Sequence, residues 1–332
     1  MLKMTKINLD LISDTDMQLF IEKGMRGGIS YIAHRYAKAN NKYMSDYNQG
    51  EENSYLMYLD ANNLYGWAMS QPLPTGDVEW IDPEEIEFFN YHEYSDKGVI
   101  VEVDLEYPEE LHDLHNDYPC ASEKICINDD ILSDYCGKTK NQRKISSGTV
   151  PKLITSLKDK TKYVLHNQNL TLYLKLGLKV KKIHRALEFS QSKWLKTYID
   201  FSTDKRKVAK NSFEKDFFKL MNNSVFGKTM ENLRKRSNIE LVTNEKRFLK
   251  LTSKPTFVSS KIFDENLVGG NMKSERLLLN KPSYVGMCIL DLSKSLMYDF
   301  HYNYITKKYT DCQLLFTDTD SLFYALQIFS VH

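Results

Sequence analysis

Residues 314–326 read LLFTDTDSLFYAL, and two aspartates, Asp318 and Asp320, interrupt a run that is otherwise typical of a buried strand. A carboxylate inside a strand core is costly unless it is paired or bound to a metal ion. On a regular strand these two side chains point to one face, whereas at a hairpin bend they can splay around a cation. Most D-x-D pairs are turns or surface pairs, but the apolar flanks here favour a chemical role.

A third carboxylate, Asp60, ends the apolar stretch SYLMYLD and precedes the turn ANNLYG. We expect Asp60, Asp318 and Asp320 to meet on two neighbouring strands. Such a set suits two divalent ions about 3.5–4 Å apart, which bind and activate phosphate oxygens. Because every ligand is an oxygen, the predicted metal is Mg²⁺, with Mn²⁺ able to substitute, and not zinc. The spacing alone does not separate a polymerase from a nuclease.

Residues 203–235 have the most helical pattern in the chain. Within them Lys207, Lys215 and Lys219 fall at positions i, i+8 and i+12, close enough in phase to share one helix face. Lysines on a helix are usually solvated. A shared face could instead bind the phosphates of a nucleotide, because ammonium groups are good phosphate ligands.

The other elements predict an α+β fold with a mostly antiparallel sheet, because strands and helices are interspersed without βαβ regularity. Residues 13–24 are expected to form a helix capped by Ser13 or Asp14, with a tight turn at 26–30 after it. Residues 109–160 are polar and irregular. The remaining predicted elements are a strand from 54 to Asp60, a strand at 98–108, a helix turning into a strand at 169–189, strand pieces within 238–290 (IELVT, TFVSSKIF, SYVGMCIL) and a helix at 291–309.

The composition is ordinary for a globular chain, with 332 residues, 42% hydrophobic and 27% charged. No apolar run reaches the roughly 18 residues of a membrane helix, and the N-terminus lacks a signal-peptide core, so we expect an intracellular protein. The net charge of +1 hides an asymmetry: residues 77–134 hold 19 acidic and 2 basic side chains, whereas 138–185 hold 13 basic and 1 acidic. Two interpretations stay open: faces that attract each other, or a basic surface that follows a phosphate backbone.

Histidines and cysteines gather in the acidic region, at His112, His115, Cys120, Cys126 and Cys136. Their spacings miss the paired C-x2-C pattern of structural zinc sites. We therefore interpret them as ordinary loop residues.

Three motifs in one order give the chain a resemblance to family B DNA polymerases. It is greatest to their protein-primed branch, found in linear plasmids, certain viruses and self-synthesising DNA transposons. LDANNLYG resembles the first palm motif, FTDTDS the second, and KLMNNSVFG the fingers motif K-x-x-x-N-S-x-Y-G with Phe226 in place of tyrosine. Arg26-Gly27-Gly28 resembles the Y-x-G-G-type turn between the exonuclease and polymerase parts, with Met25-Arg26 replacing its first half. The resemblance covers nearly the whole chain and implies template-directed DNA synthesis.

The resemblance also implies roles for single residues. Asp60 and Asp318 would hold two Mg²⁺ ions, with Asp320 beside them in support. Tyr65 would pack under the deoxyribose and reject a 2′-hydroxyl. Nucleotide contacts are implied for Asn62, Asn63, Leu64, Tyr65, Lys207, Lys215, Lys219, Asn223, Phe226 and Gly227. DNA contacts are implied for Arg26, Gly27, Gly28 and Ser321.

The implied architecture is a right hand: a palm on an antiparallel sheet, helical fingers, and insertions. Its parts are expected at 1–76 (N-terminal segment and first palm part), 77–190 (insertion with the basic stretch), 191–235 (fingers), 236–285 (second insertion) and 286–332 (second palm part). We expect a fragment with no 3′–5′ exonuclease domain and no thumb, because the motif positions leave no room for either. The implied partners are primer-template DNA, deoxynucleoside triphosphates and a terminal priming protein.

Two alternatives remain open at the level of the sequence. A catalytically inactive, nucleic-acid-binding remnant of such a polymerase would use the basic stretch and have no need of the carboxylates. A metal-dependent nuclease would use the carboxylates but has no use for Tyr65 or Lys219. A primer-extension assay with Mg²⁺ separates these possibilities.

Overall fold

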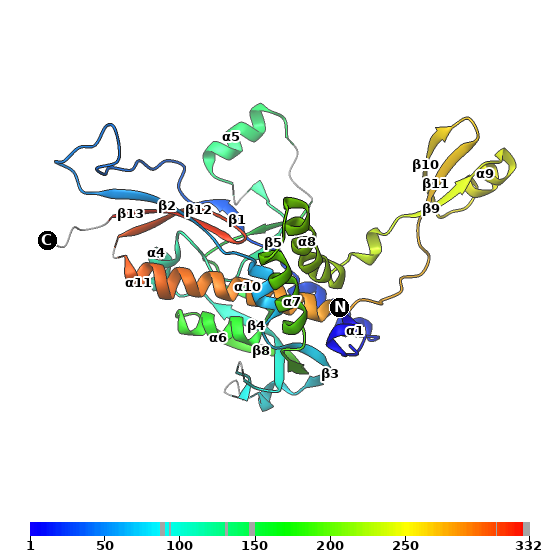
Figure 1. Ribbon diagram of the computed structural model, residues 1–332, viewed down its shortest axis with the longest axis horizontal. Coiled ribbons are helices and arrows are strands. Elements are labelled where there is room, and N and C mark those ends of the chain that lie inside the picture. The colour runs from blue at the N-terminus through cyan, green and yellow to red at the C-terminus, as the bar shows by residue number, and fades with distance from the viewer. Residues whose placement is uncertain (87–89, 93, 130–131, 146–149, 310, 328–332) are drawn as a thin grey trace.

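A computed structural model of the chain describes residues 1–86, 90–92, 94–129, 132–145, 150–309 and 311–327. Two four-stranded antiparallel sheets and a long central helix form the main body, and a small group of strands projects from one side (Figure 1). In the described ranges no helix is long and apolar enough to cross a membrane.

The first sheet brings together segments from both ends of the chain. Its strand order is β1-β12-β13-β2, and every neighbouring pair is antiparallel. The strands are β1 (Ser30–Ile32), β12 (Cys312–Asp318), β13 (Ser321–Gln327) and β2 (Ser54–Asp60). The strand–turn–strand predicted for 314–326 and the strand predicted to break at Asp60 are both confirmed.

The two faces of this sheet differ in burial because side chains alternate along a strand. One face packs on the main core through Met57, Leu59, Leu322, Tyr324 and Leu326. The opposite face carries Asp60 and Asp318, and there Tyr58 is 58% exposed. The sheet therefore presents its carboxylates on the side away from the core.

The second sheet has the order β3-β8-β4-β7, again antiparallel throughout. Its strands are β3 (Leu73–Ile81), β8 (Lys179–Ser192), β4 (Lys97–Glu106) and β7 (Lys160–His166). β4 confirms the strand predicted at 98–108. The helix that becomes a strand at 169–189 is also confirmed, by α6 (Asn167–Lys175) and β8.

Pairing of β4 with β8 sets the acidic stretch beside the basic one. Among the described residues of the two stretches, five ion pairs join one to the other, including Arg185–Glu102 at 3.0 Å and Lys181–Glu106 at 3.8 Å. These pairs favour the first interpretation of the charge asymmetry, in which the two stretches attract each other. The basic surface available to phosphates is correspondingly smaller than the sequence count suggests.

The central helix α10 (Ser283–Asp299) continues through a π-helical turn, η6 (Phe300–Ile305), into α11 (Thr306–Lys308). It confirms the helix predicted for 291–309. The strand piece predicted for SYVGMCIL is wrong, because residues 283–290 form the first two turns of α10. All eight residues are buried. A stretch that is buried all round has no polar face, so its periodicity cannot distinguish a helix from a strand.

Helices α2 (Thr15–Gly24), α3 (Leu64–Met69) and α8 (Ser212–Thr229) pack against α10, and α7 (Lys196–Lys207) packs against α8. The Asp14 side chain caps α2 by accepting from the Met17 amide at 2.9 Å, as one of the two predicted caps. The single helix implied for 203–235 is wrong. Asn211 accepts from the Glu214 amide at 2.9 Å and so starts a new helix after a break at 208–211.

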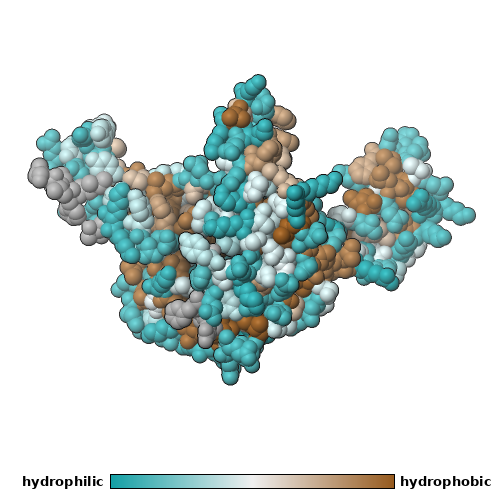
Figure 2. Space-filling model, turned by 60° about the horizontal axis from the view of Figure 1, so that its bottom comes forward, coloured by the Kyte–Doolittle hydropathy of each residue, from teal (hydrophilic) through white to brown (hydrophobic). Residues whose placement is uncertain are grey.

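The projecting module (residues 238–272) consists of β9 (Asn238–Val242), α9 (Glu245–Thr252), β10 (Phe257–Asp264) and β11 (Leu267–Met272). Val242, Leu251 and Met272 form its own small core. Figure 2 shows it as a separate lobe with apolar side chains at its surface. Ile239 and Leu241 of this module are 56% and 58% exposed. The strand pieces predicted from IELVT and TFVSSKIF are confirmed.

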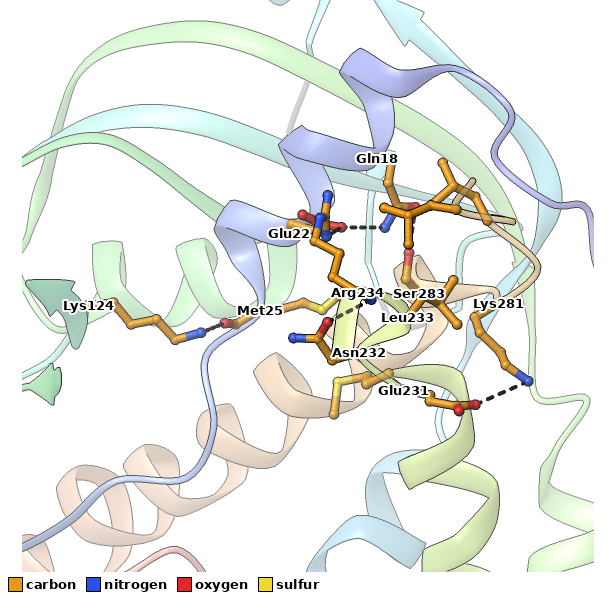
Figure 3. Close-up of a pocket in the computed structure, with 13 residues that line it drawn as sticks. Gln18, Glu22, Met25, Lys124, Glu231, Asn232, Leu233, Arg234, Lys281 and Ser283 are labelled. Carbon is orange, nitrogen blue, oxygen red and sulfur yellow. Dashed lines mark hydrogen bonds and ion pairs between the residues drawn. The ribbon is translucent and has the colours of Figure 1, made fainter. Parts of the chain in front are cut away.

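Both connections of the projecting module pass one pocket of about 240 Å³ (Figure 3). Arg234, on the outgoing connection, forms an ion pair with Glu22 of α2 at 2.6 Å. Gln18 donates to the same carboxylate at 3.1 Å and accepts from Ser283 at 3.0 Å. These contacts fasten the module's base to α2 and to the start of α10.

The remaining elements are short. They are α1 (Leu2–Thr5), η1 (Pro83–Glu85), η3 (Glu109–Leu111), α4 (His112–His115), β5 (Glu123–Ile125), α5 (Asp134–Gln142), β6 (Lys152–Ile154) and η5 (Leu233–Lys235). Most of them lie in 109–160, which agrees with the irregular region predicted there.

A buried loop at 117–122 ties both sheets to α10. Four tyrosine hydroxyls donate to its carbonyl oxygens: Tyr31 to residue 117, Tyr302 to 118, Tyr298 to 119 and Tyr163 to 122. A buried loop without such partners would carry unsatisfied backbone groups. Because the four tyrosines come from β1, η6, α10 and β7, the loop fixes these elements against one another.

Three buried histidines make the fold sensitive to acid. Burial lowers the pKa of His115 and His166 to about 4 and that of His301 to about 3. Below about pH 6.5 the unfolded chain binds protons that the folded chain does not, so stability is lost as the pH falls toward 4.

We predict that His301→Gln, whose amide can keep a hydrogen bond to Tyr324, removes part of this dependence. The loss of unfolding free energy between pH 7 and pH 5 should shrink by about 1–2 kcal/mol. Urea unfolding at the two pH values measures it, with exposed His92→Gln as the control. An unchanged pH dependence in His301→Gln would contradict the assignment.

Candidate active site

The register of the first sheet brings the carboxylates of the two motifs to one edge. Ser321 of β13 pairs with Asp318 of β12 on one side and with Asp60 of β2 on the other. Directly opposed residues point to the same face of a sheet, so the three side chains share one face. β13 lies between the other two strands, which corrects the expectation that two neighbouring strands carry the set. The Cα atoms of Asp60 and Asp318 are thus two strand spacings, about 9–10 Å, apart.

Asp320 lies in the turn between β12 and β13 and is more buried than Asp60 and Asp318. Burial raises its pKa most, and the negative charges of Asp60 and Asp318 raise it further, whereas Lys219 lowers it. Asp60 and Asp318 are themselves exposed. Three carboxylates and one lysine therefore act on each other in a single site, which we call the acidic site (Asp60, Asp318, Asp320).

The turn that carries Asp320 is strained. Thr319 has a φ of 59°, and the Asp320 amide donates to the Asp318 carbonyl at 2.7 Å. A bond across three residues with positive φ at the centre is the rarer, strained class of γ-turn. A β-branched residue in this region costs about 1–3 kcal/mol and persists only where its surroundings impose it.

Backbone hydrogen bonds impose the turn from both sides. The Thr319 amide donates to the Ile29 carbonyl at 2.8 Å, and the Ala61 amide donates to the Asp320 carbonyl at 2.7 Å. One bond joins the turn to the segment before β1, and the other joins it to the end of β2. The position of Asp320 relative to Asp60 is therefore fixed by main-chain atoms.

The sequence NNLYG shapes the chain after Asp60. Asn63 adopts a left-handed conformation with φ of 62°, which asparagine tolerates better than most residues, and α3 begins directly after it. A Cβ at position 66 would lie 1.9 Å from the Asn63 amide nitrogen Nδ2, so a larger residue there would have to push the Asn63 side chain aside. This local geometry turns Tyr65 back toward the acidic site, whose Asp320 raises the pKa of Tyr65 after the larger effect of burial.

Helix α8 reaches the acidic site through an aromatic contact. The rings of Tyr65 and Phe226 stack with centroids 4.3 Å apart and planes 18° from parallel. Lys219, Asn223 and Phe226 are spaced i, i+4 and i+7, so they share one face of α8, and Lys215 lies one turn earlier. Both lysines and Asn223 are exposed, and Gly227 faces open space.

Lys207 does not belong to this face. It ends α7, on the other side of the break at 208–211, and forms an ion pair with Asp204 at 3.1 Å. The shared helix phase of Lys207, Lys215 and Lys219 is therefore wrong, while the pair Lys215 and Lys219 remains.

Two of the four residues expected to contact DNA, Gly28 and Ser321, lie next to the turn that carries Asp320. Residues 25–29, which we call the strap, form no helix, strand or tight turn, unlike the prediction. Arg26 is buried and donates to the Val164 carbonyl at 2.7 Å, with its guanidinium 3.7 Å from the Tyr163 ring centre. A Cβ on Gly28 would lie 2.2 Å from Thr319 Oγ1, whereas one on Gly27 meets nothing. Ser321 is buried.

The donor set of the acidic site fits a hard cation. All its groups are carboxylates, and their mutual repulsion, seen in the raised pKa of Asp320, would be relieved by a divalent ion. In the described part of the chain no three His, Cys, Asp or Glu side chains stand close enough together to hold a metal ion as they lie. The interpretation of the histidines and cysteines as loop residues is wrong for His112 and His115, which lie in α4, and for Cys136, which lies in α5. Cys120 and Cys126 lie outside helices and strands, as predicted.

A family model described as DNA polymerase type B, organellar and viral, matches residues 11–305. The chain belongs to the organellar and viral type B DNA polymerases. The matched range includes Asp60, Tyr65 and Lys219 and ends before Asp318. No curated protein matches the sequence. The resemblance found in the motifs is thereby confirmed.

The fold of this type B polymerase chain is similar to that of phi29 DNA polymerase. An orthorhombic crystal form matches with a TM-score of 0.56 and 16% identity, over 99% of this chain and 46% of that chain. A ternary complex of phi29 DNA polymerase with primer-template DNA and incoming nucleotide substrates matches with a TM-score of 0.53 and 15% identity, over 99% of this chain and 46% of that chain. This chain therefore spans less than half the length of those proteins. The likeness supports the predicted mixed fold with antiparallel sheets.

Sequence reasoning did not find the residues that hold the turn. Ile29 and Ala61 act through backbone atoms, which leave no signal in residue type. The only trace in the sequence is Gly28, because a glycine can mark a place where two segments approach closely.

We predict that Asp60→Asn lowers the pKa of Asp320 toward its usual range. It should remain raised, because burial is the larger cause and persists. A carboxyl ¹³C NMR titration with labelled aspartate measures the change. Asp46→Asn, on the loop between β1 and β2, serves as the control. If Asp320 titrates identically in Asp60→Asn and the unchanged chain, the two carboxylates do not share a site.

Proposed function

We propose that this chain is the palm and fingers part of a DNA-directed DNA polymerase that adds deoxynucleotides to a primer 3′-hydroxyl. The observation that supports the proposal most is the convergence of Asp60, Asp318, Asp320, Lys219 and the Tyr65–Phe226 stack at one edge of the first sheet. A nuclease has no need of the last three of these side chains. Family membership supports the same reaction class.

In this proposal Asp60 and Asp318 would be the principal ligands of two Mg²⁺ ions at the acidic site. Such ions, when bound, would supply positive charge at the phosphates and a lower pKa for the primer hydroxyl. Asp320 is held deeper by its turn and keeps negative charge next to both ligands. Its raised pKa means that it binds a proton more readily than an ordinary aspartate until a cation offsets its neighbours.

The nucleotide would lie between α3 and α8. Lys219 faces the acidic site and would bind the triphosphate, with Lys215 one turn away as a helper. The backbone of Asn62, Asn63 and Leu64 would complete this contact. Lys207, on α7, would contribute only from a distance.

Specificity would come from the stacked pair and its neighbours. The half-buried Tyr65 ring, held by Phe226, would pack under the deoxyribose and leave no space for a 2′-hydroxyl. Asn223 and Phe226 would border the nascent base pair, and Gly227 would let it approach α8.

The reaction joins the primer to the nucleotide in one displacement. The primer 3′-oxygen forms a bond to the α-phosphorus of the deoxynucleoside triphosphate as its proton leaves. The bond from that phosphorus to the pyrophosphate oxygen breaks. The chain contributes positioning and charge stabilisation, which account for most of the catalysis of such transfers.

The parts of the chain take the roles that the motifs imply. Residues 1–76 and 286–332 supply the palm, 191–235 the fingers, and 77–190 and 236–285 two insertions. Gly27, Gly28 and Ser321 would lie beside the DNA, whereas the Arg26 side chain already binds Val164 and would act by holding the strap. A terminal priming protein would contact the first insertion.

We predict that the chain extends a primer on a single-stranded template with Mg²⁺. Asp318→Asn and Asp60→Asn should each lower the rate by at least about 10²–10³-fold, because each removes charge at the reacting phosphate. Asp200→Asn, at a surface ion pair with Lys196, is the matched control. DNA binding without any extension would favour the inactive remnant, and DNA cleavage abolished by Asp318→Asn would favour the nuclease.

We further predict that the projecting module serves strand displacement. Asn238 pairs with Met272, so replacing 238–272 by a short Gly-Ser linker rejoins two points that already lie side by side. The shortened chain should still extend a primer on single-stranded template but should stop at a downstream duplex. Gel analysis of gapped substrates measures this. Displacement synthesis at the rate of the unshortened chain would refute the assignment.

A further inference from the structure

A buried lysine, Lys294, lines the same small cavity as Thr319 in the turn that carries Asp320. Lys294 of α10 has a side chain only 7% exposed, and its Nζ donates to the Arg26 carbonyl at 2.7 Å. Nζ also donates to the Leu290 carbonyl at 3.4 Å and lies 3.6 Å from the Asp291 carboxylate, both on the same helix. Burial lowers the pKa of Lys294 to about 8, although Asp291 opposes this. Placing an ammonium group here is costly, so its hydrogen bond to the strap is the contact to explain.

Lys294 and its partners fix residue 26 from several directions. The Arg26 carbonyl binds Lys294, and the Arg26 guanidinium donates to the Val164 carbonyl of β7. Asp291 accepts from the His166 amide at 2.9 Å, at the end of the same strand. The start of the strap is therefore locked between α10 and β7.

The other end of the strap contacts Thr319 in the turn that carries Asp320. Gly28 packs directly against the Thr319 side chain, and the Ile29 carbonyl accepts from the Thr319 amide. Gly28, Tyr65, Lys294 and Thr319 line one small cavity of about 10 Å³, so little space remains for the strap to shift. Lys294 is therefore connected to the turn in two ways. It binds the strap at residue 26, and it lines the same small cavity as Thr319.

We propose that Lys294, supported by Asp291, is a positioning residue for the acidic site. By holding the strap it imposes the strained γ-turn at Thr319 and so sets where Asp318 and Asp320 stand relative to Asp60. This inference rests on the proposed function for its catalytic consequence, but its structural part stands independently. It also gives a reason for Gly28, which lets the strap come close enough for the Ile29 carbonyl to reach Thr319.

The test compares Lys294→Met with Lys160→Met in the whole chain. Lys160 is the matched control, because it is also a buried lysine, with a side chain 1% exposed, but the partners that it binds, Ser156, Lys158 and Glu123, are not residues of the strap. Hydrogen exchange followed by mass spectrometry reports on the peptide containing Thr319. We expect exchange there to speed up by about tenfold or more in Lys294→Met and to stay unchanged in Lys160→Met.

A second variant keeps the test available if Lys294→Met does not fold. Gly28→Ala leaves the lysine in place but pushes against Thr319, so it should speed up exchange in the same peptide. Unchanged protection of this peptide in a folded Lys294→Met, or in Gly28→Ala, would overturn the inference.

A kinetic experiment tests whether relieving the backbone strain at Thr319 restores the activity lost in Lys294→Met. In primer extension Lys294→Met should lower kcat by roughly 10- to 100-fold, with KM for the nucleotide within about twofold, because a misplaced ligand affects the chemical step. Thr319→Gly removes the strain that the strap must hold, so the double variant should regain most of the lost kcat. Additive losses in the double variant would overturn the inference. If the unchanged chain extends no primer, the proposed function fails, and the exchange result still decides the positioning role.

Discussion

Two backbone hydrogen bonds, from Thr319 to Ile29 and from Ala61 to Asp320, carry the geometry of the acidic site. They hold a β-branched residue in a conformation that it otherwise avoids. Without them the turn between β12 and β13 would relax, and Asp320 would no longer stand beside Asp60. The first sheet, the strap and α10 can be understood as the support that this turn needs. The strain lies next to the carboxylates of the acidic site, and such strain is common at functional sites.

The support is assembled from distant parts of the chain. Ile29 precedes β1, Ala61 follows β2, and α10 lies between the projecting module and β12. The buried loop at 117–122 adds a second set of ties, through tyrosines on β1, β7 and α10. A site built in this way depends on the whole body being folded. The projecting module, with its own core and two connections, is the part least involved in this support.

The sequence predicted the side chains of the site better than the backbone contacts that hold them in place. Asp60, Asp318, Tyr65 and Lys219 stand in motifs whose residue types have a chemical meaning, and the structure brings them together. Also predictable were β4, from its alternation of apolar and acidic residues, and α2, from its N-cap residue. The first turns of α10 were not, because burial on all sides removes the periodic signal. The break before Asn211 was missed because apolar residues continue on both sides of it, and the cap decides the boundary. Contacts made by backbone atoms left no pattern at all.

The central claim is spatial: Asp60 and Asp318, on either side of Ser321, bind the same pair of ions. Crystals of the chain grown with Mn²⁺ and a deoxynucleoside triphosphate test it directly, because anomalous scattering locates the manganese. The account predicts manganese peaks within bonding distance of both carboxylates, with the triphosphate reaching toward Lys219. Manganese bound elsewhere, or at only one of the two aspartates, would contradict it.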